Sequence, residues 1–191
     1  ADGNSNPAWV AADLLSQAEH DKMASAVLVT DSPELAQAVS REIEAQLQTL
    51  EREEIARASI EANGKIIVAR SLTQAAAVAN RIAPEHLELS VDNPFDYLGE
   101  IQNAGSIFLG RYNPEPMGDY FAGPNHTLPT MGTARFYSPL SVDDFIKKSQ
   151  FSYYTREALE KDYRKVSRFA KEEGLTAHAR AVDIRFEKEG E

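Results

Sequence analysis

Four short apolar segments, each separated from the next by a stretch with helical periodicity, constrain the fold of this chain most strongly. The segments are SAVLVT (25–30), KIIVA (65–69), HLELSV (86–91) and GSIFLG (105–110). Each is rich in β-branched or large apolar residues, and turn-forming residues lie around it, as expected for buried strands. Strands that alternate with helices predict an α/β domain with a mainly parallel sheet and flanking helices.

The helical stretches carry clear start and stop signals. Asn6 and Ser32 are each followed directly by a proline, which suits an N-cap residue and the first position of a helix. A third helical stretch, LTQAAAVANRIAP, is closed by Pro84. These signals predict one helix before each of the first three strands.

The pattern changes after SVDDFIKKSQ. Residues 155–189 predict two charged helical stretches that are broken at Gly174, and no strand follows them. We therefore expect an α/β domain over residues 1–140 and a small, mostly helical C-terminal domain over residues 141–191.

Composition excludes several classes of function. The net charge of −10 argues against a nucleic-acid partner, because phosphate binding needs a basic face. The chain has no cysteine, so thiolate zinc sites and cysteine nucleophiles are absent. No apolar run approaches the ~20 residues of a membrane helix. The first residues, ADGNSNPAW, lack Met and any basic or apolar signal. We therefore expect the sequence to begin partway through a longer protein.

The four histidines, His20, His86, His126 and His178, each lie near a carboxylate in the sequence. Acidic residues are abundant in this chain, so proximity alone says little. In QAEH, Gln17 lies three residues before His20, and both side chains project from one face of a helix. An amide oxygen and an imidazole side by side suit a divalent metal. From the spacing alone, a solvated helix end is the favoured interpretation.

The segment APEHLE places Glu85 and His86 directly after the proline that ends a helix. Ligand sites of open α/β sheets lie at the carboxyl ends of strands, and we expect the pair to face such a crevice. A carboxylate beside an imidazole there suits general acid–base chemistry. A solvated turn is an equally good interpretation of these residues alone.

The segment GDYFAGPNHTLPT (118–130) predicts a loop that its glycines and prolines make rigid. It carries Asp119 and His126. The large apolar residues expected to anchor the loop to the domain are Tyr120, Phe121 and Leu128. Gln17, His20, Asp119 and one more histidine would form a nitrogen and oxygen ligand set that suits zinc.

Six segments together resemble the histidinol dehydrogenase family, in the family's order and spacing. They are DLLSQAEHD, APEHLEL, NAGSIFLG, PEPMGDYFAGPNHTLPT, ARFYSPLSVDDF and EGLTAHARAV. The resemblance implies a Rossmann-like catalytic domain and the last two oxidations of histidine biosynthesis. L-Histidinol is converted through L-histidinal to L-histidine while two NAD⁺ are reduced. It also implies a location in the bacterial cytoplasm, or in the plastid if the source is a plant.

The resemblance assigns roles to individual residues. Glu85 and His86 match the catalytic acid–base pair. The implied ligands of one Zn²⁺ per site are Gln17, His20, Asp119 and His178. The residues implied to bind the substrate are these four ligands together with His86, His126 and Glu173.

The chain departs from the family in length, because the family's chains are more than twice as long. The resemblance implies that residues 1–140 are the second half of a split zinc- and substrate-binding domain. NAD would bind mainly to the half that is absent, so we expect the fragment to be inactive alone. The full-length protein is expected to be a homodimer in which the tail completes the partner's site. Two other functions stay open: a metal- or imidazole-binding module without NAD, and a metal-assisted hydrolase.

Overall fold

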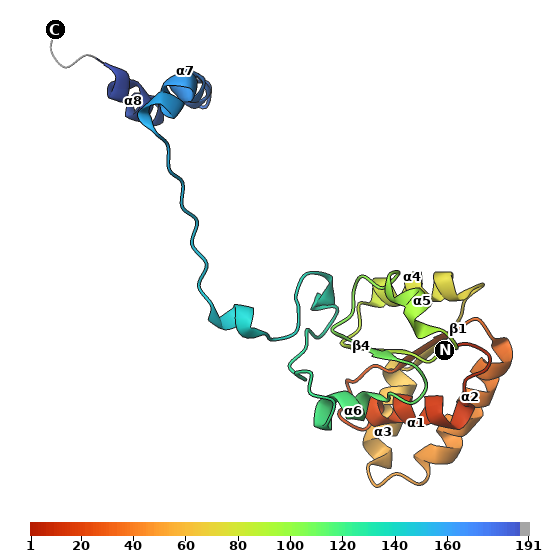
Figure 1. The fold of residues 1–191 in the computed structure, drawn as a ribbon. Helices are drawn as coiled ribbons and strands as arrows, with labels where there is room; N and C mark the ends of the chain where they lie inside the picture. Colours follow the sequence, from red (N-terminus) through yellow and green to blue (C-terminus); the bar gives the residue numbers. More distant parts are fainter. Residues whose placement is uncertain (188–191) are drawn as a thin grey trace. The chain divides into compact units, whose positions relative to one another are not determined.

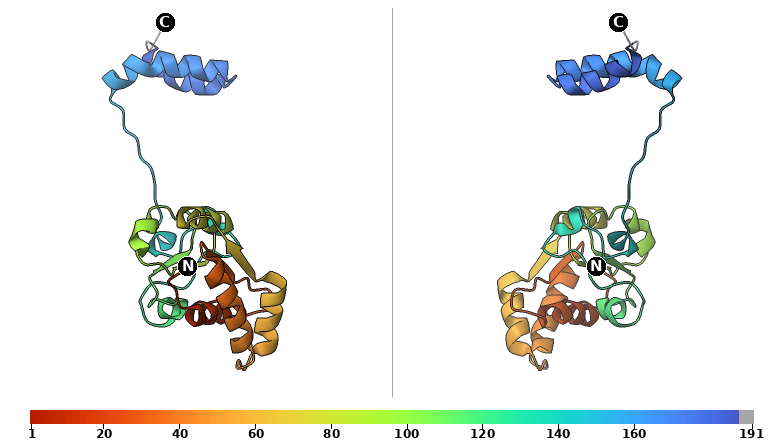
Figure 2. Two further views of the ribbon diagram at one scale, coloured as in Figure 1. Left: turned by 90° about the vertical axis from the view of Figure 1, so that its right-hand side faces the viewer. Right: turned by 90° about the vertical axis from the view of Figure 1, so that its left-hand side faces the viewer.

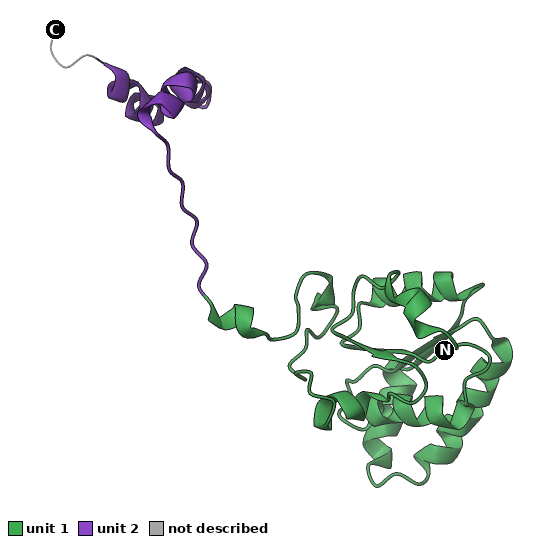
Figure 3. Ribbon diagram, in the orientation of Figure 1, with its two compact units in different colours: residues 1–146 green, residues 147–191 purple. Residues whose placement is uncertain are grey.

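A computed structural model of the chain describes residues 1–187 (Figure 1). Its contacts divide the chain into two compact units, Ala1–Ile146 (unit 1) and Lys147–Glu191 (unit 2), which Figure 3 colours separately. The positions of the two units relative to each other are not determined, so each is described by itself. In the described part of the chain, no helix has the length and apolar character needed to cross a membrane.

Unit 1 alternates helices with short strands, which confirms the predicted α/β class. The order is α1 (Pro7–Ala18), β1 (Val27–Thr30), α2 (Pro33–Leu47), α3 (Glu53–Asn63), β2 (Lys65–Val68), α4 (Leu72–Ile82), β3 (His86–Leu89), α5 (Pro94–Leu98), β4 (Ser106–Leu109) and α6 (Glu115–Tyr120). Two short 3-10 helices follow, at Thr133–Arg135 and Val142–Phe145. The side chains of Asn6 and Ser32 cap α1 and α2, as their positions in the sequence predict.

The four strands form two separate parallel pairs instead of one sheet. β1 pairs with β2, with Val27 opposite Lys65, and β3 pairs with β4, with His86 opposite Ser106. Helices α1 and α4 lie on opposite sides of the strands (Figures 1 and 2). A cavity of about 460 Å³ is lined by β1, β3, α1 and α4. The parallel arrangement was predicted, whereas the break between β1 and β3 was not.

The best-packed part of unit 1 is the cluster formed by α1, α2, α3 and β1. Val39 and Leu47 on α2 are completely buried there, and Leu15 on α1 is 2% exposed. Burying a Val or Leu side chain contributes roughly 1.5–3 kcal/mol. This cluster therefore supplies much of the folding free energy of unit 1.

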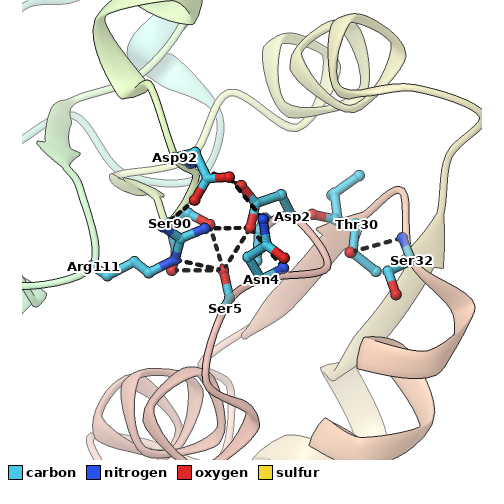
Figure 4. Close-up of polar contacts among 10 residues, drawn as sticks. Asp2, Asn4, Ser5, Thr30, Ser32, Ser90, Asp92 and Arg111 are labelled. Carbon is cyan, nitrogen blue, oxygen red and sulfur yellow. Dashed lines mark hydrogen bonds and ion pairs between the residues drawn. The ribbon is translucent and has the colours of Figure 1, made fainter.

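A polar network fixes the residues that precede α1 against the end of β3 (Figure 4). Arg111 forms an ion pair with the buried Asp2 and donates to Asp92 Oδ1 at 2.7 Å. Ser5 Oγ donates to the carbonyl oxygen of Ser90 at 2.6 Å. Because a buried carboxylate and its cation are both satisfied here, the network defines the path of the chain into α1.

Unit 2 contains α7 (Arg156–Glu172), α8 (Thr176–Asp183) and a 3-10 turn at Ile184–Phe186. The two helices are broken at Gly174, as predicted, and its φ of +75° is the left-handed conformation that favours glycine after a helix. The last few residues of the expected second helical stretch lie outside the described part of the chain.

The two helices of unit 2 pack closely against each other. Ser167 Oγ donates to Asp183 Oδ2 at 2.8 Å, and the rings of Tyr163 and Phe186 stack with their centroids 4.3 Å apart. Phe169 of α7 is 67% exposed. Apolar exposure of this size on so small a unit indicates a surface that packs against something else.

The predicted loop at residues 118–130 differs from the structure in two ways. Asp119 lies in α6, because this helix continues to Tyr120. Tyr120 and Phe121 are 82% and 85% exposed, so the expectation that they anchor the loop is wrong. The inward side of α6 is formed by Glu115 instead, and the backbone leaves helical geometry at Phe121. Leu128 is half-buried.

Candidate active site

His86 occupies the centre of a polar cluster at the amino end of β3. Its Nδ1 lies 3.2 Å from Oε1 of Gln17 on α1, and its Nε2 lies 3.7 Å from Oε1 of Glu115 on α6. If the amide oxygen of Gln17 accepts this hydrogen bond, Nδ1 carries the proton and Nε2 keeps a lone pair. The cluster lies at the amino end of the strand, so the expectation of a carboxyl-end crevice is wrong.

Helix α6 supplies two carboxyl groups to the cluster. Glu115 and Asp119 are four residues apart and therefore project from the same face of the helix. Ligand atoms of His86, Glu115 and Asp119 all lie within 4.8 Å of one another. Burial, reinforced by the hydrogen bond to Asp119 and by nearby negative charge, raises the pKa of Glu115 to about 7.

Two buried polar atoms in the cluster lack a hydrogen-bond partner, which sets them apart within the described part of the chain. They are His86 Nε2 and Glu115 Oε1. Buried polar atoms are almost always paired in folded proteins, because an unpaired one costs about 1–3 kcal/mol. Two such atoms that face each other at 3.7 Å indicate a place where a bound group belongs.

Two glycines allow the backbone to approach closely enough to build the cluster. A Cβ at Gly118 would lie 2.6 Å from the ring of Phe108 on β4, and that ring lies 6.0 Å from the His86 ring, centroid to centroid. A Cβ at Gly105 would lie 2.6 Å from the carbonyl oxygen of Glu85. Both positions therefore need glycine so that α6 and the loop before β4 can reach the Glu85–His86 segment.

A second carboxyl pair joins the three elements that form the cluster. Oε1 of Glu88 on β3 accepts a hydrogen bond of 2.9 Å from the backbone N–H of Glu115, and its carboxyl group bonds to Asp13 on α1. Burial and the charge of Asp13 raise the pKa of Glu88 to about 8, and burial also raises the pKa of Asp13. The pair therefore holds a proton at neutral pH and connects α1, β3 and α6.

The structure brings together many of the residues that the sequence singles out. Gln17, His86 and Asp119 meet in the cluster. Burial lowers the pKa of His86, the charges of Glu85 and Asp119 oppose this shift, and His20 adds to it. His20 is exposed just beyond the end of α1, and these electrostatic effects place it near His86.

Three other predicted residues do not meet the cluster in the described contacts. His126 is exposed on the segment that follows α6. Glu173 and His178 belong to unit 2, and the position of that unit relative to unit 1 is not determined. Their assignment to the site remains a prediction.

Sequence reasoning missed Glu115, Glu88 and Asp13, although two of them leave a signal. Glu88 follows His86 by two residues, so both side chains lie on one face of a strand. Glu115 precedes Asp119 by four residues, but the segment PEPMGDY looks like a loop because of its prolines and glycine. Asp13 has no distinctive pattern on α1.

The chemistry of the cluster fits a bound metal ion. The oxygen atoms of Gln17, Glu115 and Asp119 converge beside His86, and zinc and similar divalent ions accept such oxygen ligands together with imidazole nitrogen. The two unpaired atoms support the same conclusion. The site can therefore combine a metal, a neutral imidazole base and a nearby carboxylate.

Comparisons with known proteins agree on one family. The family model described as Histidinol dehydrogenase matches residues 1–186. Histidinol dehydrogenase of Listeria monocytogenes is 57% identical over 189 residues, which cover 99% of this chain and 44% of that protein. Histidinol dehydrogenase of Caldanaerobacter subterraneus is 59% identical over 186 residues, which cover 97% of this chain and 43% of that protein.

A solved structure gives the same result for the fold. The crystal structure of histidinol dehydrogenase from Elizabethkingia anophelis matches with a TM-score of 0.86 and 42% identity. The match covers 97% of this chain and 42% of that chain. The chain therefore spans less than half the length of the relatives it matches.

Proposed function

Because the chain belongs to the histidinol dehydrogenase family, we propose that its full-length protein oxidises L-histidinol through L-histidinal to L-histidine, the last two steps of histidine biosynthesis. The observation that supports this most is His86, whose unpaired Nε2 faces the buried carboxyl group of Glu115. Residues 1–140 would be the second half of the zinc- and substrate-binding domain, and residues 141–191 a helical C-terminal domain. NAD would bind mainly to the part of the protein outside this chain.

His86 is the base of the alcohol oxidation. The hydroxyl group of histidinol gives its proton to Nε2 while the carbon-bound hydrogen leaves as hydride to NAD⁺, which yields the aldehyde and NADH. The hydrogen bond from Nδ1 to Gln17 keeps the lone pair on Nε2. Burial lowers the pKa of His86, so the imidazole is neutral and able to accept a proton near pH 7.

Glu85 activates water for the aldehyde oxidation. Its carboxylate takes a proton from a water molecule that adds to the carbonyl carbon of histidinal, and then gives this proton to the carbonyl oxygen, so that the aldehyde becomes a hydrate. After His86 has released its first proton to solvent, the hydrate gives a hydroxyl proton to His86 and a hydride to the second NAD⁺, which yields the carboxylic acid. Glu85 lies beside His86 in the chain, and its charge acts on that imidazole.

The residues that would hold zinc are Gln17, His20 and Asp119 of one subunit and His178 of a second subunit. When bound, the ion positions the imidazole and amine of the substrate. Asp119 would act as a zinc ligand beside Glu115, to which it is hydrogen-bonded. The amide oxygen of Gln17 faces His86 and has a second lone pair that could bind the ion. His126 and Glu173 would contact the substrate.

The assignment of His178 and Glu173 to the site, although both belong to unit 2, supports a dimer. This unit is too small to hold a core of its own, and its large exposed apolar residues need a surface to cover them. These residues are Val166, Phe169, Leu175 and Ile184. A tail exchanged between identical subunits would cover them and deliver both functional residues to the neighbouring site. The curated relatives named above are bacterial, and we place the full-length enzyme in the bacterial cytoplasm.

The test uses the full-length enzyme with histidinol and histidinal supplied separately, and NADH formation as the readout. His86→Asn should slow both oxidations by roughly 100-fold or more, because a general base contributes about that much. Glu85→Gln should slow oxidation of histidinal far more than oxidation of histidinol. The 191-residue chain alone should produce no NADH.

Each of these measurements has one result that would contradict part of the proposal. No NADH from histidinol with the wild-type enzyme would overturn the proposed activity. Equal losses on both substrates for Glu85→Gln would leave the activity in place and remove Glu85 as the water activator. NADH produced by the chain alone would overturn the view that it is incomplete.

A further inference from the structure

A supporting layer of hydrogen bonds, formed by Asp13, Glu88 and the backbone N–H of Glu115, joins the same three elements as the His86 cluster. Glu88 follows His86 by two residues, so both side chains lie on one face of β3. Asp13 precedes Gln17 by four residues, so both side chains project from one face of α1. Glu115 is the first residue of α6. Each element therefore contributes one group to the cluster and one group to the supporting layer.

Helix α6 needs Glu88 because its own sequence provides no cap. The N-cap residue is Pro114, whose side chain makes no capping hydrogen bond. Pro116 lacks an N–H, and the N–H of Met117 bonds to the carbonyl of Pro114 at 3.0 Å. The N–H of Glu115 takes its partner from outside the helix, because Oε1 of Glu88 accepts from it at 2.9 Å. A side chain of β3 therefore does for α6 what an N-cap side chain does for other helices.

The carboxyl groups of Glu88 and Asp13 are hydrogen-bonded to each other, so one proton must lie between them. Burial raises the pKa of Glu88 to about 8, and Glu88 therefore carries this proton at neutral pH. A protonated carboxyl group can make two different contacts. Oε1 accepts from the N–H of Glu115, while the hydroxyl group donates to Asp13, so Glu88 links α6 to α1.

The groups that flank the His86 ring belong to the two helices that Glu88 links. Glu115 begins α6, and its Oε1 lies 3.7 Å from Nε2, the atom that takes the proton in the proposed reaction. Gln17 lies one turn after Asp13 on α1, and its Oε1 lies 3.2 Å from Nδ1 of the same ring. A shift of either helix would therefore change the surroundings of the imidazole.

We propose that Glu88 is a positioning residue of the active site: through its hydrogen bonds to Asp13 and to the first N–H of α6, it fixes the His86 ring between the two helices. This inference rests on the proposed function, in which His86 is the base. A displacement of about 1 Å at a reacting group can cost about 100-fold in rate. Glu88 would therefore control the rate of both oxidations without contact with the reacting atoms.

The contribution of Glu88 is geometric, because it is held as a neutral acid. The charges that act on the His86 imidazole belong to Glu85, Asp119 and His20. Glutamine should therefore replace Glu88, since its amide oxygen accepts a hydrogen bond and its amide nitrogen donates one. Methionine has a similar length and makes neither contact. These two replacements separate the hydrogen bonds from the volume of the side chain.

The first test compares Glu88→Met with Glu88→Gln in the full-length enzyme, with histidinol and histidinal supplied separately. Glu88→Met should lower kcat for both substrates by about 10–100-fold, because His86 loses its place. Glu88→Gln should keep kcat near the wild-type value for both. Full activity in Glu88→Met would overturn the proposal. So would a loss in Glu88→Gln as large as in Glu88→Met, because it would show that the acid itself is required.

The proton on Nδ1 of His86 provides a second readout, which does not depend on turnover. Because Gln17 accepts from it, this proton should resonate downfield of the backbone amides in the proton NMR spectrum. Full-length enzyme with isotopically labelled histidine allows it to be observed, and its absence from His86→Asn assigns it. The resonance should persist in Glu88→Gln and shift or disappear in Glu88→Met. An unchanged resonance in Glu88→Met would mean that Glu88 does not position the ring, and would overturn the proposal.

A double variant separates position from stability. In Glu88→Met the carboxylate of Asp13 stays half-buried without its partner, which is destabilising. Asp13→Leu/Glu88→Met replaces both partners with apolar groups and should recover most of the lost stability in urea unfolding. It should not recover kcat, because the N–H of Glu115 still lacks its acceptor. The double variant also replaces Glu88→Met in every comparison if the single variant does not fold.

Leu47→Ala is the matched control, because it weakens the cluster of α1, α2 and α3, and α2 contributes nothing to the supporting layer. It should unfold at a lower urea concentration and keep the wild-type kcat. If it loses as much kcat as Glu88→Met, or if the double variant regains kcat together with stability, activity follows stability and the proposal fails. Absence of NADH from histidinol with the wild-type enzyme would instead overturn the proposed function, and the His86 resonance would still decide whether Glu88 positions the ring.

Discussion

The two strand pairs of unit 1 share a topology and differ in what they bury. The β1–β2 half (residues 1–68) buries apolar side chains such as Val39 and Leu47, both with no exposure to solvent. The β3–β4 half (residues 69–146) buries carboxyls and an imidazole whose pKa values are displaced. The first half therefore stabilises the fold, whereas burying titratable groups in the second half costs part of that stability. α1 belongs to the first half and reaches the second through Asp13 and Gln17.

The largest expected effect tests the claim about stability. Leu47→Ala should lower the free energy of unfolding by roughly 2–5 kcal/mol, because it leaves a cavity in the cluster of α1, α2 and α3. Phe121→Ala in the other half should change it by less than about 0.5 kcal/mol, because that side chain is 85% exposed. Urea unfolding of both variants measures the difference. A Phe121 variant as unstable as the Leu47 variant would show that the β3–β4 half also carries the core.

The sequence predicted the β1–β2 half better than the β3–β4 half, for physical reasons. Asn6 and Ser32 precede proline and cap their helices, and short apolar runs mark the strands. Helix α3 was missed because its N-cap residue, Arg52, provides no side-chain hydrogen bond, so its start leaves no signal. Helix α6 was missed because proline and glycine are typical of loops, yet Gly118 is there to admit the ring of Phe108.

The candidate site was predictable where neighbours in sequence are neighbours in space. Gln17 and His20, or Glu85 and His86, are close along the chain and could be paired from spacing. The contacts of Glu88 with Asp13 and with Glu115 depend on how α1, β3 and α6 pack, which no local pattern encodes. The break between β1 and β3 is also invisible in the sequence, because each strand looks complete by itself.

The second prediction concerns the boundary between the halves, where Ala1 lies. Its amine has a pKa of about 6 in the folded chain and 8.0 as the unperturbed value. Between these values the unfolded chain binds more protons, so this group adds stability as pH rises from 6 to 8 and removes it as pH falls. A shift of this size corresponds to roughly 2–3 kcal/mol at the acidic end of the window.

Glu88 and Glu115 have raised pKa values in the same pH range and act with the opposite sign, so the difference between two proteins is the useful quantity. The chain acetylated on Ala1 keeps both carboxyls and loses the titrating amine. Acetylation should therefore stabilise the chain more at pH 6 than at pH 8, as measured by urea unfolding at both values. An equal effect at the two pH values would mean that the Ala1 amine is hydrated, and that the boundary between the halves is open to water.

The substitution with the smallest expected effect on stability tests whether the packing of α6 sets the position of Asp119 in the β3–β4 half. Gly118→Ala adds a methyl group 2.6 Å from the buried Phe108 ring, so the ring and α6 must move apart, and any shift of α6 carries Asp119 with it. In the full-length enzyme, zinc affinity measured against a competing chelator should fall by about 10–100-fold, as for other changes that displace a ligand's support. Stability should change little, because alanine favours a helix by about 0.5–1 kcal/mol over glycine and offsets part of the clash.

Gly99→Ala is the matched control for that substitution. Gly99 follows α5 in the same half with an ordinary φ of −69°, and a Cβ there would meet nothing within 4 Å. Its zinc affinity and stability should both stay at the wild-type values. If Gly118→Ala binds zinc as tightly as Gly99→Ala, then α6 does not set the position of Asp119, and the carboxyls of the β3–β4 half do not depend on close packing against Phe108. If Gly118→Ala instead unfolds the protein as readily as Leu47→Ala, the division between a stabilising half and a reactive half fails.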